Sequence, residues 1–228
     1  MRLRGIQPML SASAITALHD QLTDKWHQNP IEVIPARTSP QNSETRSEES
    51  LDPVAAFADL VARQHQANFD LWHIEDEARA PGATDSELAA VKRHIDQANQ
   101  LRNDLVEQLD RTLLERLAPQ RLPNPEAPLN SESPGLIIDR LSILALKIFH
   151  THEETARRDA SASHIERNRG RLAILQEQRA DLAGCLDSLW HEALAGTRQF
   201  KLYRQLKMYN DPDLNPAIYR KPLAESGR

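Results

Sequence analysis

The sequence predicts an all-α protein, built as a bundle of four long helices with a short N-terminal helix and a C-terminal basic helix plus tail. Aromatic residues make up only 4% of the 228 residues and glycines number 7, whereas sheet proteins need aromatic and β-branched strands separated by frequent turns. The 14 prolines are clustered, which leaves long stretches without proline. Apolar residues recur at helical spacing within these stretches, so the stretches are predicted to be helices.

Composition also excludes several kinds of site and setting. Cys185 is the single cysteine, so neither an intramolecular disulfide nor a multi-cysteine metal site can form. The chain has no run of about 18 apolar residues, and we expect a cytoplasmic protein without membrane insertion. The net charge of -5 gives no overall attraction to nucleic acid, so no nucleic-acid partner is expected.

The chain divides into four regions by composition. Residues 1–28 form an N-terminal helix region, in which apolar residues at helical spacing predict a short helix over 11–28. Residues 29–51 are rich in Pro, Ser, Thr, Asn and Glu and are predicted to be a flexible linker. The helical bundle then covers 52–217, and 218–228 is expected to be a loose tail. The apolar residues of the N-terminal helix are Ile15, Leu18, Leu22 and Trp26.

Capping residues mark the first two long helices. Asp52 is followed by a proline, which is typical of a helix start, and the helix should run over about 53–79. A capping box at Thr84 opens the second helix, which should run over about 84–117.

The last three predicted helices follow an extended connection rich in proline. Ser133 precedes a proline and caps a helix over about 134–159. A polar segment separates it from a helix over about 163–195, which Gly196 ends. A shorter basic helix is predicted over about 198–209, where an Asn-Asp-Pro sequence stops it.

Several polar side chains fall on the apolar faces of the first, second and fourth long helices when each residue is turned by 100° on a helical wheel. His73, in contrast, falls on the outer face of the first long helix. An arginine within an apolar stripe needs a partner, so these residues are candidates for an internal polar site. The inward polar residues are Gln64, Asn68, Glu75, Asn99, Arg102, Asn168 and Arg179.

The third long helix is apolar around most of its circumference, as expected for the most buried helix of a bundle. Its polar residues, which include Asp139, Lys147 and His150, nevertheless fall within one arc of roughly 160°. Together with the inward residues of the other helices, they are predicted to converge on a polar interior. Two interpretations follow: an ion-pair network that fixes the helix register, or a pocket that binds a phosphate or carboxylate.

Residue spacings that suit metal binding or catalysis give weaker evidence of a site than the inward polar residues do. His150 shares one helix face with Glu153 and Glu154, a pair able to hold a metal ion. The Glu-x-x-His order of di-iron bundles is absent. Acidic residues such as Glu75 and Asp104 suggest a Mg²⁺-dependent nucleotide hydrolase as a minor alternative. No Ser-His-Asp site, activated cysteine or glycine-rich phosphate loop is evident, so cofactor, metal and enzymatic activity stay open.

Four stretches of the sequence resemble one bacterial, all-helical family catalogued as a domain of unknown function. They are LWHIEDEAR, KRHIDQANQLRNDLVEQLD, NSESPGLIIDRLSILALKIFH followed by HEE, and KLYRQLKMYNDP. The resemblance covers about residues 65–215, and members of that family often lie near cell-envelope glycosyltransferases. The signature positions that the resemblance implies are Trp72, His73, Glu75, Asp76, Asp96, Asn99, Arg102, Asp104, Asn130, Glu132, Ser133, Asp139, Arg140, Lys147 and His150.

The functional hypothesis is a polar interior that binds an anionic, phosphorylated small molecule, in keeping with cell-envelope sugar metabolism. The alternative is a non-catalytic interaction module whose protein partner is an enzyme such as a glycosyltransferase. In the first hypothesis, the acid, base and proton-transfer roles fall to Glu75, Asp139 and His150. The residues expected to bind the ligand are Asn99, Arg102, Lys147 and Arg179.

Overall fold

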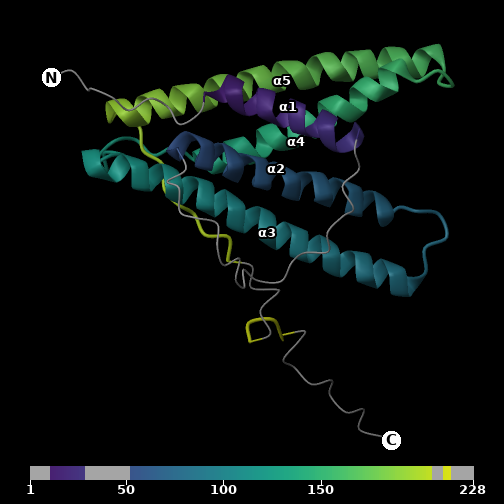
Figure 1. Cartoon of the computed structure of the whole chain (residues 1–228), viewed down its shortest axis with the longest axis horizontal. Coiled ribbons are helices and arrows are strands. Elements are labelled where there is room, and N and C mark those ends of the chain that lie inside the picture. Colours follow the sequence, from purple (N-terminus) through teal and green to yellow (C-terminus); the bar gives the residue numbers. More distant parts are fainter. Residues whose placement is uncertain (1–10, 29–51, 207–212, 217–228) are drawn as a thin grey trace, which may run out of the picture.

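A computed structural model describes residues 11–28, 52–206 and 213–216, and these form five α-helices without a strand (Figure 1). The all-helical class predicted from the sequence is therefore confirmed. The predicted linker over 29–51 and tail over 218–228 lie outside the described residues. The helices are α1 (Ala12–Gln28), α2 (Pro53–Glu77), α3 (Asp85–Leu117), α4 (Pro134–Ala156) and α5 (Ala162–Ala195), with the 3₁₀ turn η1 (Ala118–Gln120) after α3.

The helices begin and end at the residues that local chemistry favours. The Thr84 hydroxyl accepts a hydrogen bond from the backbone N–H of Glu87, whose carboxylate accepts the N–H of Thr84 at 2.7 Å, so the capping box is formed. The Ser133 hydroxyl accepts the N–H of Leu136 at the start of α4. Gly196 ends α5 with φ 72°, a left-handed conformation that glycine adopts without steric cost.

Helix α4 is the centre of the bundle. It packs against each of the other four helices, with α5 along one side and α2 and α3 along the other (Figure 1). Leu141 and Leu146 are fully enclosed at these contacts. The apolar circumference of this helix in the sequence thus reflects neighbours on all sides.

Helix α1 is part of the bundle. It packs against α4, α2 and α5, and it buries Ile15 and Trp26. The backbone N–H of Ala12 donates to the Asp187 carboxylate of α5 at 2.9 Å, which holds the start of α1 in place. The bundle therefore consists of five packed helices.

The start of α4 approaches α3 closely. The backbone N–H of Gly135 donates to the Asp110 carboxylate at 2.7 Å, and the Ser133 hydroxyl donates to the same carboxylate. A Cβ atom on Gly135 would lie 2.7 Å from the backbone oxygen of Val106, which is closer than real contacts allow. Burial raises the pKa of Asp110 to about 6. Only glycine fits this position without moving the two helices apart.

The predicted C-terminal basic helix over 198–209 is wrong for its described part, since residues 198–206 are not helical. After Gly196 the backbone pairs with the connection before α4: the N–H of Gln199 donates to the oxygen of Pro128 at 3.0 Å, and its carbonyl accepts the N–H of Asn130 at 2.8 Å. Phe200 is buried in the main core. These long-range contacts satisfy backbone groups that a helix would have satisfied locally.

No helix of the described residues is both long enough and apolar enough to cross a membrane.

Candidate functional site

A ladder of buried hydrogen-bonded side chains, here called the polar ladder, crosses the bundle from α3 to α1. It starts at the guanidinium of Arg102, whose Nε and Nη2 donate to Asp139 of α4 at 2.8 and 2.5 Å. The amides of Gln64 and Asn68 on α2 donate to the same carboxylate at 2.7 and 2.9 Å. This hydrogen bonding holds the pKa of Arg102 above its ordinary value. Asp139 is thus a buried anion with three partners.

The ladder continues through α4 and α2 to α1. The amide of Asn68 donates to the hydroxyl of Ser142 at 2.9 Å, and this oxygen lies 2.7 Å from Nδ1 of His65. On the other side of the ring, Nε2 lies 2.9 Å from the hydroxyl of Thr23. The Thr23 hydroxyl donates to the backbone oxygen of His19 at 2.9 Å, so it accepts from Nε2–H of His65. Nδ1 of His65 then accepts from Ser142, and every bond of the ladder has one donor and one acceptor.

Burial keeps the histidines of the ladder neutral. It lowers the pKa of His65 to about 4, and it lowers the pKa of His19 well below its ordinary value. The two rings stack with their centroids 4.6 Å apart. A neutral His65 is the form that the hydrogen bonds to Ser142 and Thr23 require.

One hollow beside the ladder, the α2–α3 pocket, brings together three of the residues that were assigned catalytic or ligand-binding roles from the sequence. Glu75, Asn99 and Arg102 line it, and its volume is about 480 Å³. Asp139 lies behind Arg102 and does not line the pocket. Glu75 pairs with Arg79 at 3.2 Å at the rim, and its side chain is 41% exposed, so it points inward less than the wheel predicted. The complete lining is Asn68, Leu71, Trp72, Glu75, Asp76, Arg79, Asn99, Arg102, Ile143 and Leu146.

The other predicted residues lie elsewhere. Lys147 and His150 line a second hollow between α4 and α5. Trp72 lines both this hollow and the α2–α3 pocket. Arg179 donates to the Asp20 carboxylate of α1 at 2.6 Å and lines neither hollow. Gln64, Asn68 and Arg102 therefore meet at Asp139 as the sequence predicted, whereas Lys147, His150 and Arg179 lie apart from them.

Three histidines meet where α1, α2 and α4 come together, and we call them the histidine cluster: His27, His73 and His150. One ring nitrogen from each lies within 4.8 Å of those of the other two. The ring centroid of His27 lies 5.3 Å from that of His73 and 4.9 Å from that of His150, and the centroids of His73 and His150 are 6.0 Å apart. The wheel placed His73 on the outer face of its helix, which is wrong because α1 covers that side of α2.

Neighbouring groups orient two rings of the histidine cluster. Nδ1 of His27 lies 2.8 Å from the backbone oxygen of Thr23, and Nδ1 of His150 lies 3.0 Å from the Glu153 carboxylate. Nε2 of each of these two rings is buried without a hydrogen-bond partner among the described residues. Burial lowers the pKa of His73 and of His150, so the neutral rings are favoured.

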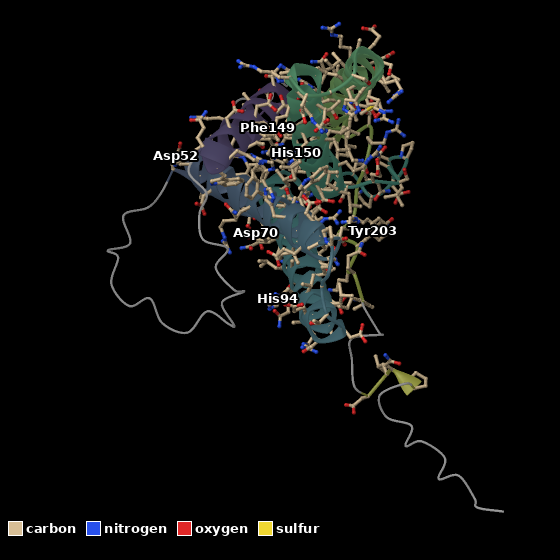
Figure 2. All side chains as sticks on the ribbon, turned by 90° about the vertical axis from the view of Figure 1, so that its right-hand side faces the viewer. Asp52, Asp70, His94, Phe149, His150 and Tyr203 are labelled. Carbon is tan, nitrogen blue, oxygen red and sulfur yellow. The ribbon has the colours of Figure 1, made fainter. Side chains whose placement is uncertain are left out.

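Aromatic rings enclose the histidine cluster. Phe149 stacks on His27 with centroids 4.1 Å apart, and Trp72 stacks on His150 at 4.8 Å. Phe69 meets His73 edge to face at 4.5 Å. Figure 2 shows His150 beside Phe149, with His94 well apart from them.

A further hollow, with a volume of about 1100 Å³, forms a groove along α4 and α5. Residues of both helices line it, among them Arg140 of α4, and so does Glu132, which pairs with Arg140 at 2.7 Å. Lys147 also reaches it. We call this surface the α4–α5 groove.

The sequence patterns missed part of what the structure places together. His19 and Thr23 follow Ile15 at intervals of four residues, so they lie on the buried stripe of α1, and this spacing was the available signal. His27 follows Thr23 at the same interval, and His65 lies four residues from both Val61 and Phe69 on the buried stripe of α2, so the spacing was available for these two residues as well. Asp104, named for the Mg²⁺ alternative, is exposed and accepts from Gln100 on the same helix.

Comparison with known families gives one match. The model of the family described as "Protein of unknown function (DUF4254)" matches residues 58–202, which is more than half of the chain. No curated protein and no solved structure matches the chain.

Proposed function

The chain belongs to the DUF4254 family, and from that premise we propose that it binds a small anionic, phosphorylated molecule of the sugar type in the α2–α3 pocket, in the cytoplasm. The observation that supports the proposal is a single hollow of about 480 Å³ that combines Arg102 with both hydrogen-bond donors and carboxylates. A hollow of this size suits a small molecule.

Arg102 is the proposed anion ligand. Its guanidinium has five N–H donors, and Asp139 accepts two of them. Three donors are left for a ligand, because no further partner is formed among the described residues. Asp139 holds the group in one orientation, so a phosphate meets a preorganised donor set. In this proposal Asp139 is a positioning residue.

The rim of the pocket supplies the other groups. Arg79 and Glu75 form an exposed ion pair, and such a pair contributes no more than about 1 kcal/mol. It can therefore open when an anion arrives, which frees a second cation. Glu75 and Asp76 can then accept hydrogen bonds from hydroxyl groups, and Asn99 adds an amide. The pocket would thus bind a phosphate group and several hydroxyl groups together, and a sugar phosphate carries both.

Of the residues expected to bind the ligand, Asn99 and Arg102 keep that role in the proposal. Glu75 is the carboxylate available for acid or base chemistry at the pocket. Lys147, His150 and Arg179 are given no part in it, since none of them lines this pocket.

Calorimetric titration of the full-length chain tests the proposal. We expect binding of glucose 6-phosphate or a nucleotide sugar, and weaker binding of the same sugar without phosphate. Arg79→Gln should weaken binding about tenfold, since it removes one charge-assisted hydrogen bond. Arg140→Gln is the matched control, because Arg140 also forms an exposed pair with a glutamate but lines the α4–α5 groove.

Two results would contradict the proposal. One is the absence of binding to every sugar phosphate, nucleotide sugar and inorganic phosphate, with and without Mg²⁺ or Mn²⁺. The other is equal weakening by Arg79→Gln and Arg140→Gln, which would place the anion elsewhere or show a general effect of charge.

The second candidate is a non-catalytic module that binds a partner protein, and the α4–α5 groove favours it. Its volume of about 1100 Å³ exceeds what a small ligand fills. Ile174 of α5 lines the neighbouring hollow, which shares Lys147 with the groove, and its exposed fraction is 55%; in this candidate it adds apolar surface beside the groove for a partner such as a glycosyltransferase. A co-purification assay with Ile174→Asp against Arg79→Gln separates the two functions, since only the first change should weaken partner binding.

A further inference from the structure

The histidine cluster carries an inference that is independent of the α2–α3 pocket. His27, His73 and His150 come from three different helices, α1, α2 and α4, and so the fold itself brings the rings together. Imidazole nitrogen is a ligand that Zn²⁺, Cu²⁺, Ni²⁺ and Fe²⁺ accept readily. Three histidines form the protein part of many sites with one open position.

The separations of the rings suit one shared ion. Zinc binds histidine nitrogen at about 2.0–2.1 Å, so rings arranged tetrahedrally around one zinc ion place their centroids about 5 Å apart. The observed centroid separations are 4.9, 5.3 and 6.0 Å. The rings are also steeply inclined, with interplanar angles of 63° to 81°. Steep angles let ring edges point to a common centre, whereas parallel rings would present their faces to each other.

Hydrogen bonding selects the tautomer that leaves a metal-binding nitrogen. The backbone oxygen of Thr23 only accepts, so Nδ1 of His27 carries the proton and Nε2 carries the lone pair. The Glu153 carboxylate fixes His150 in the same way. Both Nε2 atoms are buried and lack a partner among the described residues. A metal ion would satisfy both of these nitrogen atoms at once.

The surroundings match those of a metal site. Metal-bound histidines usually donate their second N–H to a carboxylate or a backbone oxygen, and both kinds of partner are present at Glu153 and Thr23. The Phe149 and Trp72 rings hold His27 and His150 in place by stacking. Rigid walls reduce the entropy lost on binding.

We propose that His27, His73 and His150 bind one divalent transition-metal ion, with Zn²⁺ as the ion of first choice. The ion would tie α1 and α2 to α4 at this end of the bundle. The fourth coordination position stays available to water, because the described part of the chain groups only these three potential ligands there.

Calorimetric titration of the EDTA-treated and desalted full-length chain with ZnCl₂ tests the proposal. We expect one Zn²⁺ per chain and a rise in Tm, since an ion that binds only the folded chain stabilises it. His73→Ala should weaken binding by more than about 100-fold, because it removes a direct ligand. His94→Ala is the matched control: His94 is exposed on α3 and lies away from the cluster (Figure 2).

A second variant guards against a folding defect in His73→Ala. Glu153→Gln changes an exposed side chain that orients His150, and it should weaken Zn²⁺ binding by about 10- to 100-fold. Co²⁺ bound in place of Zn²⁺ should give an absorption spectrum typical of nitrogen ligands in wild type and His94→Ala, and not in His73→Ala. The proposal is overturned if wild type binds none of Zn²⁺, Co²⁺ and Ni²⁺ stoichiometrically. It is equally overturned if His94→Ala weakens binding as much as His73→Ala, or if Glu153→Gln leaves the affinity unchanged.

Discussion

Replacing Arg102 by methionine should destabilise the fold even though the side chain lies at the edge of a pocket. Its partner Asp139 is only 7% exposed, against 24% for Arg102. Removing one member of a buried pair costs about 3–5 kcal/mol, because the other charge stays buried. Gln64 and Asn68 still donate to the carboxylate, which keeps the loss near the lower limit. We therefore expect Arg102→Met to reduce the free energy of unfolding by about 3 kcal/mol.

A second substitution isolates the charge as the cause. Adding Asp139→Asn to Arg102→Met removes the unpaired charge, and about 2 of the 3 kcal/mol should return. Arg79→Met is the control, since its pair with Glu75 is exposed and should contribute no more than about 1 kcal/mol. Urea unfolding followed by far-UV circular dichroism measures all four free energies. A loss below about 1 kcal/mol for Arg102→Met, or no recovery in the double variant, would refute the argument.

Three other predictions concern stability. Gly135→Ala should lower the free energy of unfolding by about 1–3 kcal/mol, since its Cβ would lie 2.7 Å from the backbone oxygen of Val106. Gly184→Ala is the control: it lies on the open face of α5 and should raise the free energy of unfolding by about 0.5–1 kcal/mol. Equal effects of the two substitutions in urea unfolding would contradict this prediction. Burial lowers the pKa of His65 from 6.5 to about 4, so between these pH values the folded chain binds fewer protons at this ring than the unfolded chain. About 3 kcal/mol of the free energy of unfolding is therefore present above pH 6.5 and is lost as the pH falls to 4. His65→Gln should remove that part of the acid dependence, and urea unfolding curves between pH 4 and 7 that keep the wild-type slope would count against a neutral ring. Phe200→Ala should cost about 3–5 kcal/mol, because the ring is 2% exposed in the core, whereas an unchanged thermal midpoint would show that the C-terminal segment does not hold the bundle together.

The helices could be predicted because their limits are set by local chemistry. The capping box at Thr84 and the left-handed Gly196 act within one turn of the helix that each one bounds. The segment after Gly196 could not be predicted in this way. Gln199 pairs with Pro128 and Asn130, about 70 positions earlier, and no short pattern of basic and aromatic residues contains that information.

The candidate site was predictable where a helix has one buried face. Helix α3 buries one stripe, and the wheel correctly placed Asn99 and Arg102 toward the same neighbours. Helix α2 differs because α3, α4 and α1 contact it from different sides. A wheel with one apolar centre then misplaces side chains such as His73, which lies between helices although it is opposite the main stripe.

The two groups of histidines in this bundle differ in a way that separates support of the fold from metal binding. His19 and His65 stack with an interplanar angle of 28°, so the two rings face each other and cannot direct their nitrogen atoms to one point. His19 buries both ring nitrogens without a hydrogen-bond partner among the described residues, which shows that an unpartnered nitrogen alone does not indicate a metal. His27 and His150 add what His19 lacks: a steep angle of 75° between their rings, and a third imidazole within reach. The convergence of three rings therefore distinguishes a metal site from a buried histidine pair, and His73, which the helical wheel placed on the outer face of its helix, is the ring that completes the cluster.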